Sequence, residues 1–229
     1  MSQSVGRALD LIEAVAASSR PMGLMELAEA CQLDKSTASR LLKFLSERAF
    51  LERASEDRRY ALGPLLQVIA TQGLYQFNLR TVARAYLEKL RDITGETATL
   101  HIPVRDQRIC IDGVTSIHSI SCVVSLGELL PLTSGVGGKV LIAFPASESA
   151  RRMSPQVAKA VGVTRRLGYL AAVGDRVAGV GVVAAPIVVG GIARASIVVG
   201  GPSDRWDLRA MHQFGTTIRS AAHDISARL

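Results

Sequence analysis

The sequence predicts an α+β protein of two domains, in which a small helical domain with a β-hairpin precedes a larger domain of mixed helices and strands. Apolar residues recur every three or four positions in the first quarter of the chain. They alternate with other residues in short strand-like segments beyond Gly95, and return to helical spacing at the end of the chain. We therefore expect a helical domain over 1–62, a linker helix over 63–77 and a second domain over 78–229.

The strongest helical pattern lies between Leu33 and Leu51. On a helix its apolar residues form one narrow stripe, made of Ala38, Leu41, Leu42, Leu45 and Ala49. Asp34 or Ser36 can cap its N-terminus and leave backbone N–H groups free at that end. The polar side chains near this end are Lys35, Ser36, Thr37, Ser39, Arg40 and Lys43. Such a helix is suited to meet DNA phosphates and base edges, although a solvated surface helix is the alternative for this stretch alone.

Two shorter helical patterns precede this stretch. The first has an apolar stripe of Val5, Ala8, Leu9, Ile12 and Ala16, widened by Leu11 and Val15 toward either the core or a partner subunit. After a break at Pro21, the second pattern runs from Leu24 to Cys31, and a tight turn over 32–34 leads into the longer helix. Two short helices, a three-residue turn and a longer helix are typical of a helix-turn-helix unit.

A β-hairpin is expected directly after this unit. Leu51 leads to a charged tip over 55–58, and Tyr60 and Leu62 return. Three basic side chains lie near the tip, namely Arg53, Arg58 and Arg59. Beside a recognition helix, such a hairpin can reach phosphates or a minor groove, whereas a charged surface turn is the alternative. We therefore predict a winged helix-turn-helix over 1–62.

Within the first domain, the excess of positive charge that would favour a nucleic-acid partner is confined to one segment. The net charge is +7, but residues 1–62 carry nine basic and nine acidic side chains. Within this segment, residues 34–62 hold seven basic side chains against five acidic ones. Because the excess is confined there, a DNA-binding interpretation depends on the geometry of the motif and not on the overall pI.

Length and composition bound the remaining possibilities. A chain of 229 residues, 48% of them hydrophobic, can bury a sizeable core. Neither a run of about 18 apolar residues nor a signal sequence is present, so we expect no membrane partner and no export. Cys31, Cys110 and Cys122 lack metal-ligand spacing and suit a reducing compartment, which predicts a cytoplasmic protein.

Several helices are expected beyond the hairpin. Pro64 opens a linker helix, and Asn78 can cap a second helix that Gly95 ends. A short helix, GKVLIAF, is expected to open at Gly138. The chain closes with a helix over 208–229, whose apolar residues follow a 3-4-3-4 spacing.

Strands are expected between these helices. A first hairpin turns at Asp106-Gln107, which would place His101 opposite Asp112. A further strand is expected over about 120–124, and the segment 147–176 reads as helix and loop without a clear pattern.

A second hairpin has the clearest strand pattern. Segments 180–189 and 192–201 flank Gly190-Gly191, a two-residue turn that tolerates positive φ. Both segments are apolar on both faces, so we expect the hairpin to be covered on both sides or to face a pocket.

Taken in order, these motifs resemble the IclR family of bacterial transcriptional regulators. The resemblance spans almost the whole chain and is carried by SVGRALDLIEAV (4–15), LAEACQLDKSTASRLLKFLSERAFLER (27–53), YALGPLLQVIA (60–70), GETATLHI (95–102), RICIDGV (108–114), PLTSGVGGKVLIAF (131–144) and GVVAAPIVVGGIARASIVVGGP (181–202). It implies an N-terminal winged helix-turn-helix and a C-terminal effector-binding domain with a GAF-like antiparallel sheet flanked by helices. It also implies a homodimer, often paired into a homotetramer, on palindromic operators in double-stranded DNA, and control of catabolic genes by a small organic-acid effector.

The resemblance also assigns effector-contacting positions where motifs match. These are Ser119, Ser121, Val136, Gly137, Gly138, Asp175, Val182, Ser196, Val198 and Gly200. The glycines stand before a helix, where backbone N–H groups can hold a carboxylate. Family members that bind small keto-acids tend to have hydroxyl or thiol groups at the positions of Val198 and Gly200. We therefore expect a more apolar effector here, such as an aromatic or longer-chain acid.

Two other classes of function are less well supported. A phosphate loop is excluded at Gly135–Lys139, because Thr133 and Val140 stand where that motif needs glycine and Ser/Thr. The four histidines, His101, His118, His212 and His223, form no metal-binding cluster, so we expect no metal, no cofactor and no enzyme activity. A sensing or interaction module without DNA binding is the remaining alternative, which the near-neutral charge of 1–62 favours.

Overall fold

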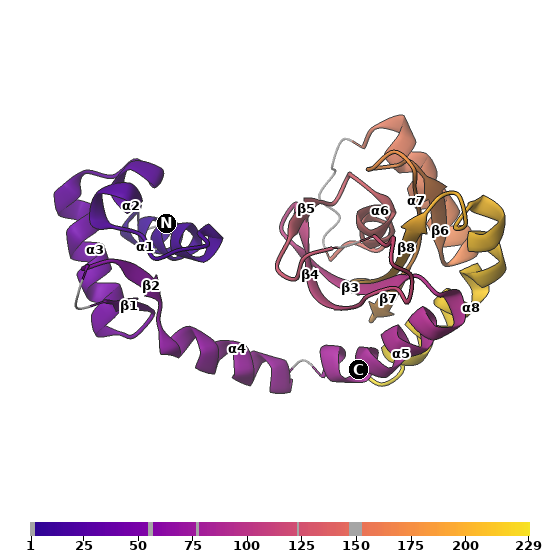
Figure 1. The fold of residues 1–229 in the computed structure, drawn as a ribbon, viewed down its shortest axis with the longest axis horizontal. Helices are drawn as coiled ribbons and strands as arrows, with labels where there is room; N and C mark the ends of the chain where they lie inside the picture. The colour runs from indigo at the N-terminus through magenta and orange to yellow at the C-terminus, as the bar shows by residue number, and fades with distance from the viewer. Residues whose placement is uncertain (1–2, 55–56, 77, 123, 147–152) are drawn as a thin grey trace. The chain divides into compact units, whose positions relative to one another are not determined.

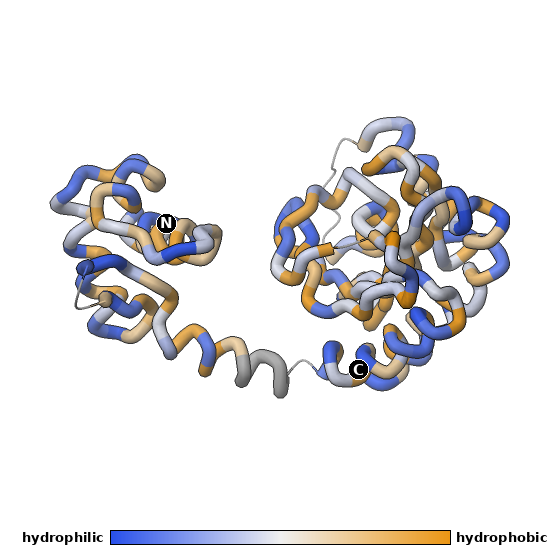
Figure 2. Tube along the Cα trace, viewed as in Figure 1, coloured by the Kyte–Doolittle hydropathy of each residue, from blue (hydrophilic) through white to orange (hydrophobic). Residues whose placement is uncertain are grey.

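The computed structural model divides the chain into two compact units, Met1–Gln76 and Phe77–Leu229. Figure 1 shows the fold of each unit, and Figure 2 shows the hydropathy of each residue along the same trace. The structure describes residues 3–54, 57–76, 78–122, 124–146 and 153–229, with the backbone alone over 71–76. Within these ranges, no helix combines the length and the apolar character needed to cross a membrane.

The first unit is a three-helix core with a hairpin and a trailing helix. Its elements are α1 (Gln3–Ala17), α2 (Leu24–Ala30), α3 (Lys35–Glu47), β1 (Leu51–Arg53), β2 (Tyr60–Leu62) and α4 (Pro64–Gln76). Leucines from α1, α2 and α3 meet in one core that also buries Leu51 and Tyr60 of the hairpin. The predicted winged helix-turn-helix is confirmed, and burial of its apolar stripes is the main force that holds it together.

The apolar stripe predicted for α1 is only partly correct. Leu11 and Val15 are buried, whereas Val5 and Leu9 have 60% and 50% of their surface exposed. The helix turns Leu11 and Val15 toward α3 and the hairpin, because that side completes the leucine core. Val5 and Leu9 are left as an exposed apolar face.

Helix α3 ends earlier than predicted. It stops at Glu47, so Ala49 lies outside its apolar stripe, while the other four predicted stripe residues are buried. Ala49 has a φ of 56°, and the Phe50 N–H donates to the carbonyl of Leu45 over 2.9 Å. The chain therefore reverses direction here and enters the hairpin.

The hairpin is tied to the segment before α2. Strands β1 and β2 are antiparallel, with Leu51 opposite Leu62. Tyr60 exchanges two backbone hydrogen bonds with Met22, of 2.9 and 2.8 Å. This third short segment stabilises a hairpin that would be marginal alone.

The second unit is built on one antiparallel sheet. Its elements are α5 (Leu79–Thr94), β3 (Thr97–Val104), β4 (Gln107–Val114), β5 (Leu129–Pro131), α6 (Val136–Ile142), α7 (Pro155–Leu167), β6 (Leu170–Val173), β7 (Val180–Val189), β8 (Ile192–Pro202) and α8 (Leu208–Ser226). The strand order is β5-β4-β3-β8-β7-β6. Helices α5 and α8 pack on one face of the sheet, and α6 lies against its other face and contacts α7 (Figure 1).

The β7–β8 hairpin is apolar on both faces because both faces are covered. Val183 and Ile197 belong to the large core beneath α5 and α8. Ala184, one position on, packs against α6 on the opposite face. The predicted Gly190-Gly191 turn is confirmed, since both glycines adopt positive φ, of 60° and 79°.

Several predictions for this unit are wrong in detail. The described residues of 120–124 form no strand, and α6 begins at Val136, two positions before Gly138. The ambiguous segment 147–176 contains α7 and the edge strand β6, while 147–152 lie outside the described residues. Alternation alone did not reveal β6, because it is four residues long.

The predicted His101–Asp112 pair is also wrong. A register shift between Leu100 and His101 places His101 opposite Cys110 and Asp112 opposite Leu100. Asp112 is buried and accepts from Arg84 over 3.0 Å, while His101 is bonded to Thr99 over 3.0 Å. A β-bulge of this kind cannot be seen in a simple alternating pattern.

A cluster of charges around Glu26 holds the hairpin to α2. The Glu26 carboxylate accepts from Arg20 over 2.7 Å, from the Gly23 N–H over 2.6 Å and from Arg59 over 2.9 Å. The hydrogen bond from Arg20, followed by that from the Gly23 N–H, lowers the pKa of Glu26 from 4.5 to about 2.

We expect this cluster to stabilise the protein in a pH-dependent way. Because the folded-state pKa of Glu26 is lowered, its contribution is complete above about pH 4.5 and is lost as the pH falls toward 2. The melting temperature of Glu26→Gln should therefore lie below that of the wild type at pH 7, with a smaller difference at pH 3. Glu29→Gln, an exposed position on the same helix, is the control. A difference that stays constant with pH would contradict the assignment.

Candidate nucleic-acid interface and ligand pocket

The N-terminus of α3 is fixed by Asp34. Its carboxylate accepts from the Thr37 N–H over 2.8 Å and from the Ser36 hydroxyl over 2.6 Å. The bond from the Ser36 hydroxyl is the largest cause that holds the pKa of Asp34 well below its usual range. Asp34 is thus the cap, as one of the two predicted alternatives, and Ser36 supports it.

The outer face of α3 presents the residues predicted to contact DNA. Lys35, Ser36, Ser39, Arg40 and Lys43 are exposed, and Thr37 is half-buried. Lys43 lies 3.8 Å from Glu47 one turn later. Among the described residues, Arg40 has no ion-pair or hydrogen-bond partner, so its guanidinium is available to a phosphate or base.

The three arginines of the hairpin have different surroundings. Arg53 lies over the Tyr60 ring at 5.3 Å and donates to the carbonyl of Arg58. Arg58 is exposed, and its positive φ of 56° lets the chain turn between the two strands of the hairpin. Arg59 also donates to the carbonyl of Pro21 and pairs with Glu26, so it anchors the hairpin. Arg58 is consequently the freest of the three to meet a phosphate.

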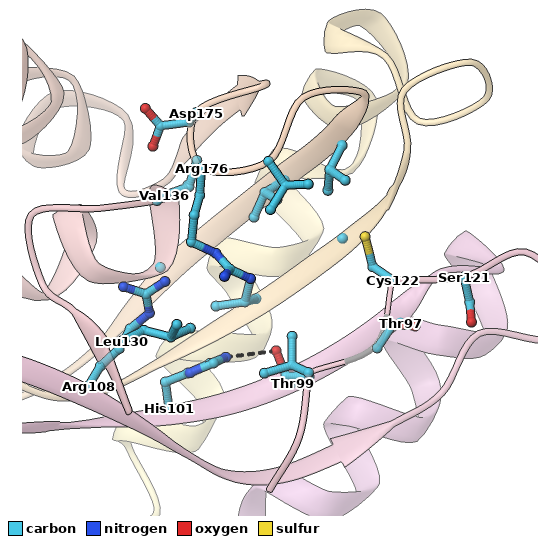
Figure 3. A pocket seen from close by; sticks show the side chains of 18 residues that line it. Thr97, Thr99, His101, Arg108, Ser121, Cys122, Leu130, Val136, Asp175 and Arg176 are labelled. Carbon is cyan, nitrogen blue, oxygen red and sulfur yellow. Dashed lines mark hydrogen bonds between the residues drawn. The ribbon is translucent and has the colours of Figure 1, made fainter. Parts of the chain in front are cut away.

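The second unit encloses a cavity of about 310 Å³ between the sheet, α6 and two loops. Figure 3 shows the side chains around it. The lining residues are Thr97, Thr99, His101, Arg108, Ser121, Cys122, Val124, Leu130, Gly135, Val136, Gly137, Asp175, Arg176, Val177, Val180, Val182, Val198 and Gly200. This size suits a small organic molecule.

Seven of the ten predicted effector-contacting residues lie in this lining. They are Ser121, Val136, Gly137, Asp175, Val182, Val198 and Gly200. Ser119, Gly138 and Ser196 do not line the cavity. The Ser196 hydroxyl donates to the carbonyl of Gly137 over 3.0 Å, and a Cβ on Gly138 would overlap the carbonyl oxygen of Leu132. Ser196 and Gly138 therefore lie behind the residues that line the cavity and help to hold them in place.

Arg108 supplies the main polar group of the pocket. It projects from β4, is 4% exposed, and donates from Nη1 to the carbonyls of Pro131 and Ser134, each over 2.7 Å. Its Nε is buried without a partner among the described residues. Burial, then the nearby charge of Arg176, lowers the pKa of Arg108 to about 10, so the side chain stays cationic at neutral pH.

The glycine run before α6 is explained by Arg108. A Cβ on Gly135 would lie 3.1 Å from Nη2 of Arg108, and one on Gly138 would lie 2.7 Å from Nη1. Gly135 also has a φ of 76°. The run therefore lets the guanidinium approach the backbone closely, and the N–H groups of Gly138 and Lys139 are bonded to the carbonyl of Gly135. The predicted use of the N–H groups of Val136 and Gly137 for a carboxylate stays a prediction, and Arg108 adds a cation beside them.

His101 and Thr99 form the floor beside Arg108 (Figure 3). His101 is 2% exposed, and its Nδ1 has no partner among the described residues. Burial, followed by the charges of Arg108 and Arg176, lowers the pKa of His101 to about 3. The imidazole is therefore neutral at pH 7 and offers hydrogen bonding without charge.

The opposite wall comes from the loop between β6 and β7. Asp175 pairs with Lys139 of α6, which fixes the loop to that helix. Arg176 turns into the cavity (Figure 3) and lies 3.9 Å from Glu128. The sequence did not predict that Arg108, Arg176 and His101 line the pocket. The available signal was Arg108 itself, a charged residue within the otherwise apolar strand segment RICIDGV.

No group of three or more potential metal ligands occurs among the described His, Cys, Asp and Glu residues. Burial raises the pKa of the Cys110 thiol to about 11, and burial also raises the pKa of the Cys122 thiol that lines the pocket. Neither thiol is activated as a nucleophile.

Comparison with known proteins identifies both units. The IclR helix-turn-helix domain matches residues 4–55, and the C-terminal domain of bacterial transcriptional regulator IclR matches residues 71–227. The chain is 29% identical to the glycerol operon regulatory protein of Streptomyces coelicolor over 81% of this chain and 78% of that protein. It is 29% identical to the transcriptional repressor IclR of Escherichia coli over 66% of this chain and 56% of the repressor.

Solved structures share the fold. An IclR transcriptional regulator from Alicyclobacillus acidocaldarius has a TM-score of 0.81 at 20% identity, covering 99% of this chain and 98% of that one. An IclR homologue from Microbacterium hydrocarbonoxydans, solved with 4-hydroxybenzoate, has a TM-score of 0.80 at 18% identity and covers 99% of this chain and all of the other. The matched domains, one on each unit, show that the chain belongs to the IclR family of bacterial transcriptional regulators.

Proposed function

We propose that this chain is a DNA-binding transcriptional regulator of catabolic genes, whose second unit binds a small organic acid that changes its affinity for DNA. The observation that carries the proposal is the pairing, in one chain, of a capped recognition helix with a pocket that contains a buried cation, Arg108, and a more exposed one, Arg176. A cytoplasmic location, on the nucleoid when DNA is bound, follows from this role. A sensing module without DNA binding is the alternative.

The DNA-binding part of the proposal is supported by the outer face of α3 and by the hairpin. Arg40 and Arg58 are exposed and positively charged, and the Asp34 cap orders the start of the helix that carries Arg40. We propose that α3 enters the major groove and that Lys35, Ser36, Thr37, Ser39, Arg40 and Lys43 contact it. Arg53, Arg58 and Arg59 of the hairpin would lie along phosphates or the minor groove.

The effector part of the proposal is supported by the presence of both apolar and cationic side chains in the pocket lining. Val182 and Val198 supply apolar lining, while Arg108 (Figure 3) supplies a cation. An acid with an apolar body satisfies both kinds of lining. The homologue from Microbacterium hydrocarbonoxydans was solved with 4-hydroxybenzoate, and this supports an aromatic acid as one candidate class here.

We propose that the protein is a homodimer, two of which can pair into a tetramer, and that it binds a palindromic operator. Val5 and Leu9 on α1, and Val68 and Ile69 on α4, are exposed large apolar side chains within the single chain. Such side chains are usually covered when a partner is present. Ligand and DNA would then be coupled through the arrangement of subunits that each prefers.

Removal of Arg40 or Arg58 should weaken DNA binding. We expect Arg40→Ala and Arg58→Ala each to lower the affinity for a duplex selected from a random pool by the wild-type protein. Each should also reduce the slope of log K against log salt by about 1, because one phosphate contact is lost. Fluorescence anisotropy over a salt series measures both quantities. Arg209→Ala, an exposed arginine of α8, is the control. Failure of the wild type to select any duplex would favour the alternative without DNA binding.

Disruption of the apolar face of α1 should weaken self-association. Leu9→Glu places a charge on this face and should shift the sedimentation equilibrium of the chain from dimer toward monomer. Met25→Glu, at a position of similar exposure on α2, is the matched control. If the wild type sediments as a monomer, or if Leu9→Glu leaves the dimer unchanged, α1 is not the interface.

A ligand of the correct class should stabilise the protein and alter its DNA affinity. We expect a saturable rise in melting temperature with some members of a panel of aromatic and aliphatic acids, because a ligand that binds only the folded state stabilises it. The same acids should change the affinity for the selected duplex by about 5- to 150-fold. An acid that raises the melting temperature without altering DNA affinity would contradict the coupling of the two units.

A further inference from the structure

Building on the proposed effector function of the pocket, on which this step rests, we infer that the effector is a monocarboxylate held between the guanidinium groups of Arg108 and Arg176. Arg108 reaches the cavity from β4, and Arg176 reaches it from the loop between β6 and β7 (Figure 3). Two like charges that face one cavity repel each other. An anion placed between them converts this repulsion into two attractive contacts.

The hydrogen-bonding state of Arg108 leaves one edge without a partner, and such an anion could supply it. Nη1 is occupied by the carbonyls of Pro131 and Ser134, but the buried Nε has no partner among the described residues. Nε and Nη2 share the edge of a guanidinium that a carboxylate grips with two parallel hydrogen bonds. Gly137 keeps the space beside this edge clear, since a Cβ there would lie 3.5 Å from Nε and 2.9 Å from Cγ2 of Val198.

The charges around the cavity favour a ligand with a single negative charge. Lys139 is paired with Asp175, and Glu96 is paired with Arg205. Glu128, 3.9 Å from Arg176, offsets one of the two remaining cations. Arg108 has no ion-pair partner among the described residues, so one positive charge stays uncompensated.

The remainder of the pocket offers no site for a second charge. His101 is neutral at pH 7, as described above, and Thr97 and Thr99 carry hydroxyl groups only. Val180, Val182 and Val198 supply apolar surface. A second carboxylate would lose its hydration without gaining a cation, so a dicarboxylate should bind less well than a monocarboxylate of the same body.

Isothermal titration and thermal melts of the full chain at pH 7 test this assignment. The probes are two matched sets, namely benzoate, benzamide and terephthalate, and hexanoate, hexanamide and adipate. We expect at least one monocarboxylate to bind saturably, and to bind about tenfold or more tightly than its amide and its dicarboxylate. Arg176→Gln should remove this preference. It is the principal variant because Arg176 is partly exposed and makes only a distant contact with Glu128, so the fold does not depend on it.

Arg166→Gln is the matched control, since it removes one exposed positive charge from α7 of the same unit. A preference that survives in Arg176→Gln, amides that bind as tightly as acids, or no binding of any probe to the wild type would each overturn the assignment. DNA affinity in the absence of any acid is measured in parallel. If an amide binds and changes that affinity, the regulatory function stands and the monocarboxylate assignment falls.

Discussion

The burial of the Arg108 guanidinium is the constraint on which the architecture of the second unit depends. A buried cation is costly unless hydrogen bonds replace its hydration, and here the carbonyls of Pro131 and Ser134 do so from one side. Pro131 ends β5, and Ser134 lies in the segment that joins β5 to α6, so this part of the chain must lie close to Arg108 of β4. A side chain at Gly138 would collide with the Leu132 carbonyl and the guanidinium, and Gly135 adopts a positive φ close to it, which explains both glycines. One side chain thereby sets the path of the chain, the start of α6 and the polar end of the pocket.

The β7–β8 hairpin connects this pocket to the main core. Alternate residues of each strand serve the two faces, so that Val183 and Val199 are buried beneath α5 and α8 while Val182 and Val198 line the cavity. A ligand that contacts Val182 or Val198 therefore contacts a strand whose next residue is locked in the core. Close packing leaves such a strand little freedom to adjust residue by residue. Displacement of the hairpin as a whole is the movement that this packing permits, and it offers a physical route from ligand to helices.

The fold could be predicted from the sequence wherever burial has a simple period. The α3 stripe, the Asp34 cap, the Gly190-Gly191 turn and the two-faced hairpin all follow local rules of spacing and propensity. Prediction failed where tertiary contacts decide between local alternatives. The core of the first unit selects Leu11 and Val15 over Val5 and Leu9 on the same helix, and a register shift at His101 separates it from Asp112. The hairpin positions predicted for a pocket, Val182, Val198 and Gly200, line the cavity, but its cations were missed, because the burial of Arg108 depends on a segment more than twenty residues away in the sequence.

The near-neutral charge of the first 62 residues does not oppose DNA binding once the structure is considered. Glu26 is engaged by Arg20 and Arg59 within the domain, and Asp34 accepts hydrogen bonds as the cap of α3. These carboxylates are therefore occupied by internal partners, Glu26 in turn occupies Arg20 and Arg59, and the side chains left unpaired decide which charges DNA can meet. Arg40 and Arg58 remain directed at solvent. Under the proposed dimer, affinity depends on the simultaneous placement of two recognition helices, so a ligand that changes their arrangement would change DNA binding.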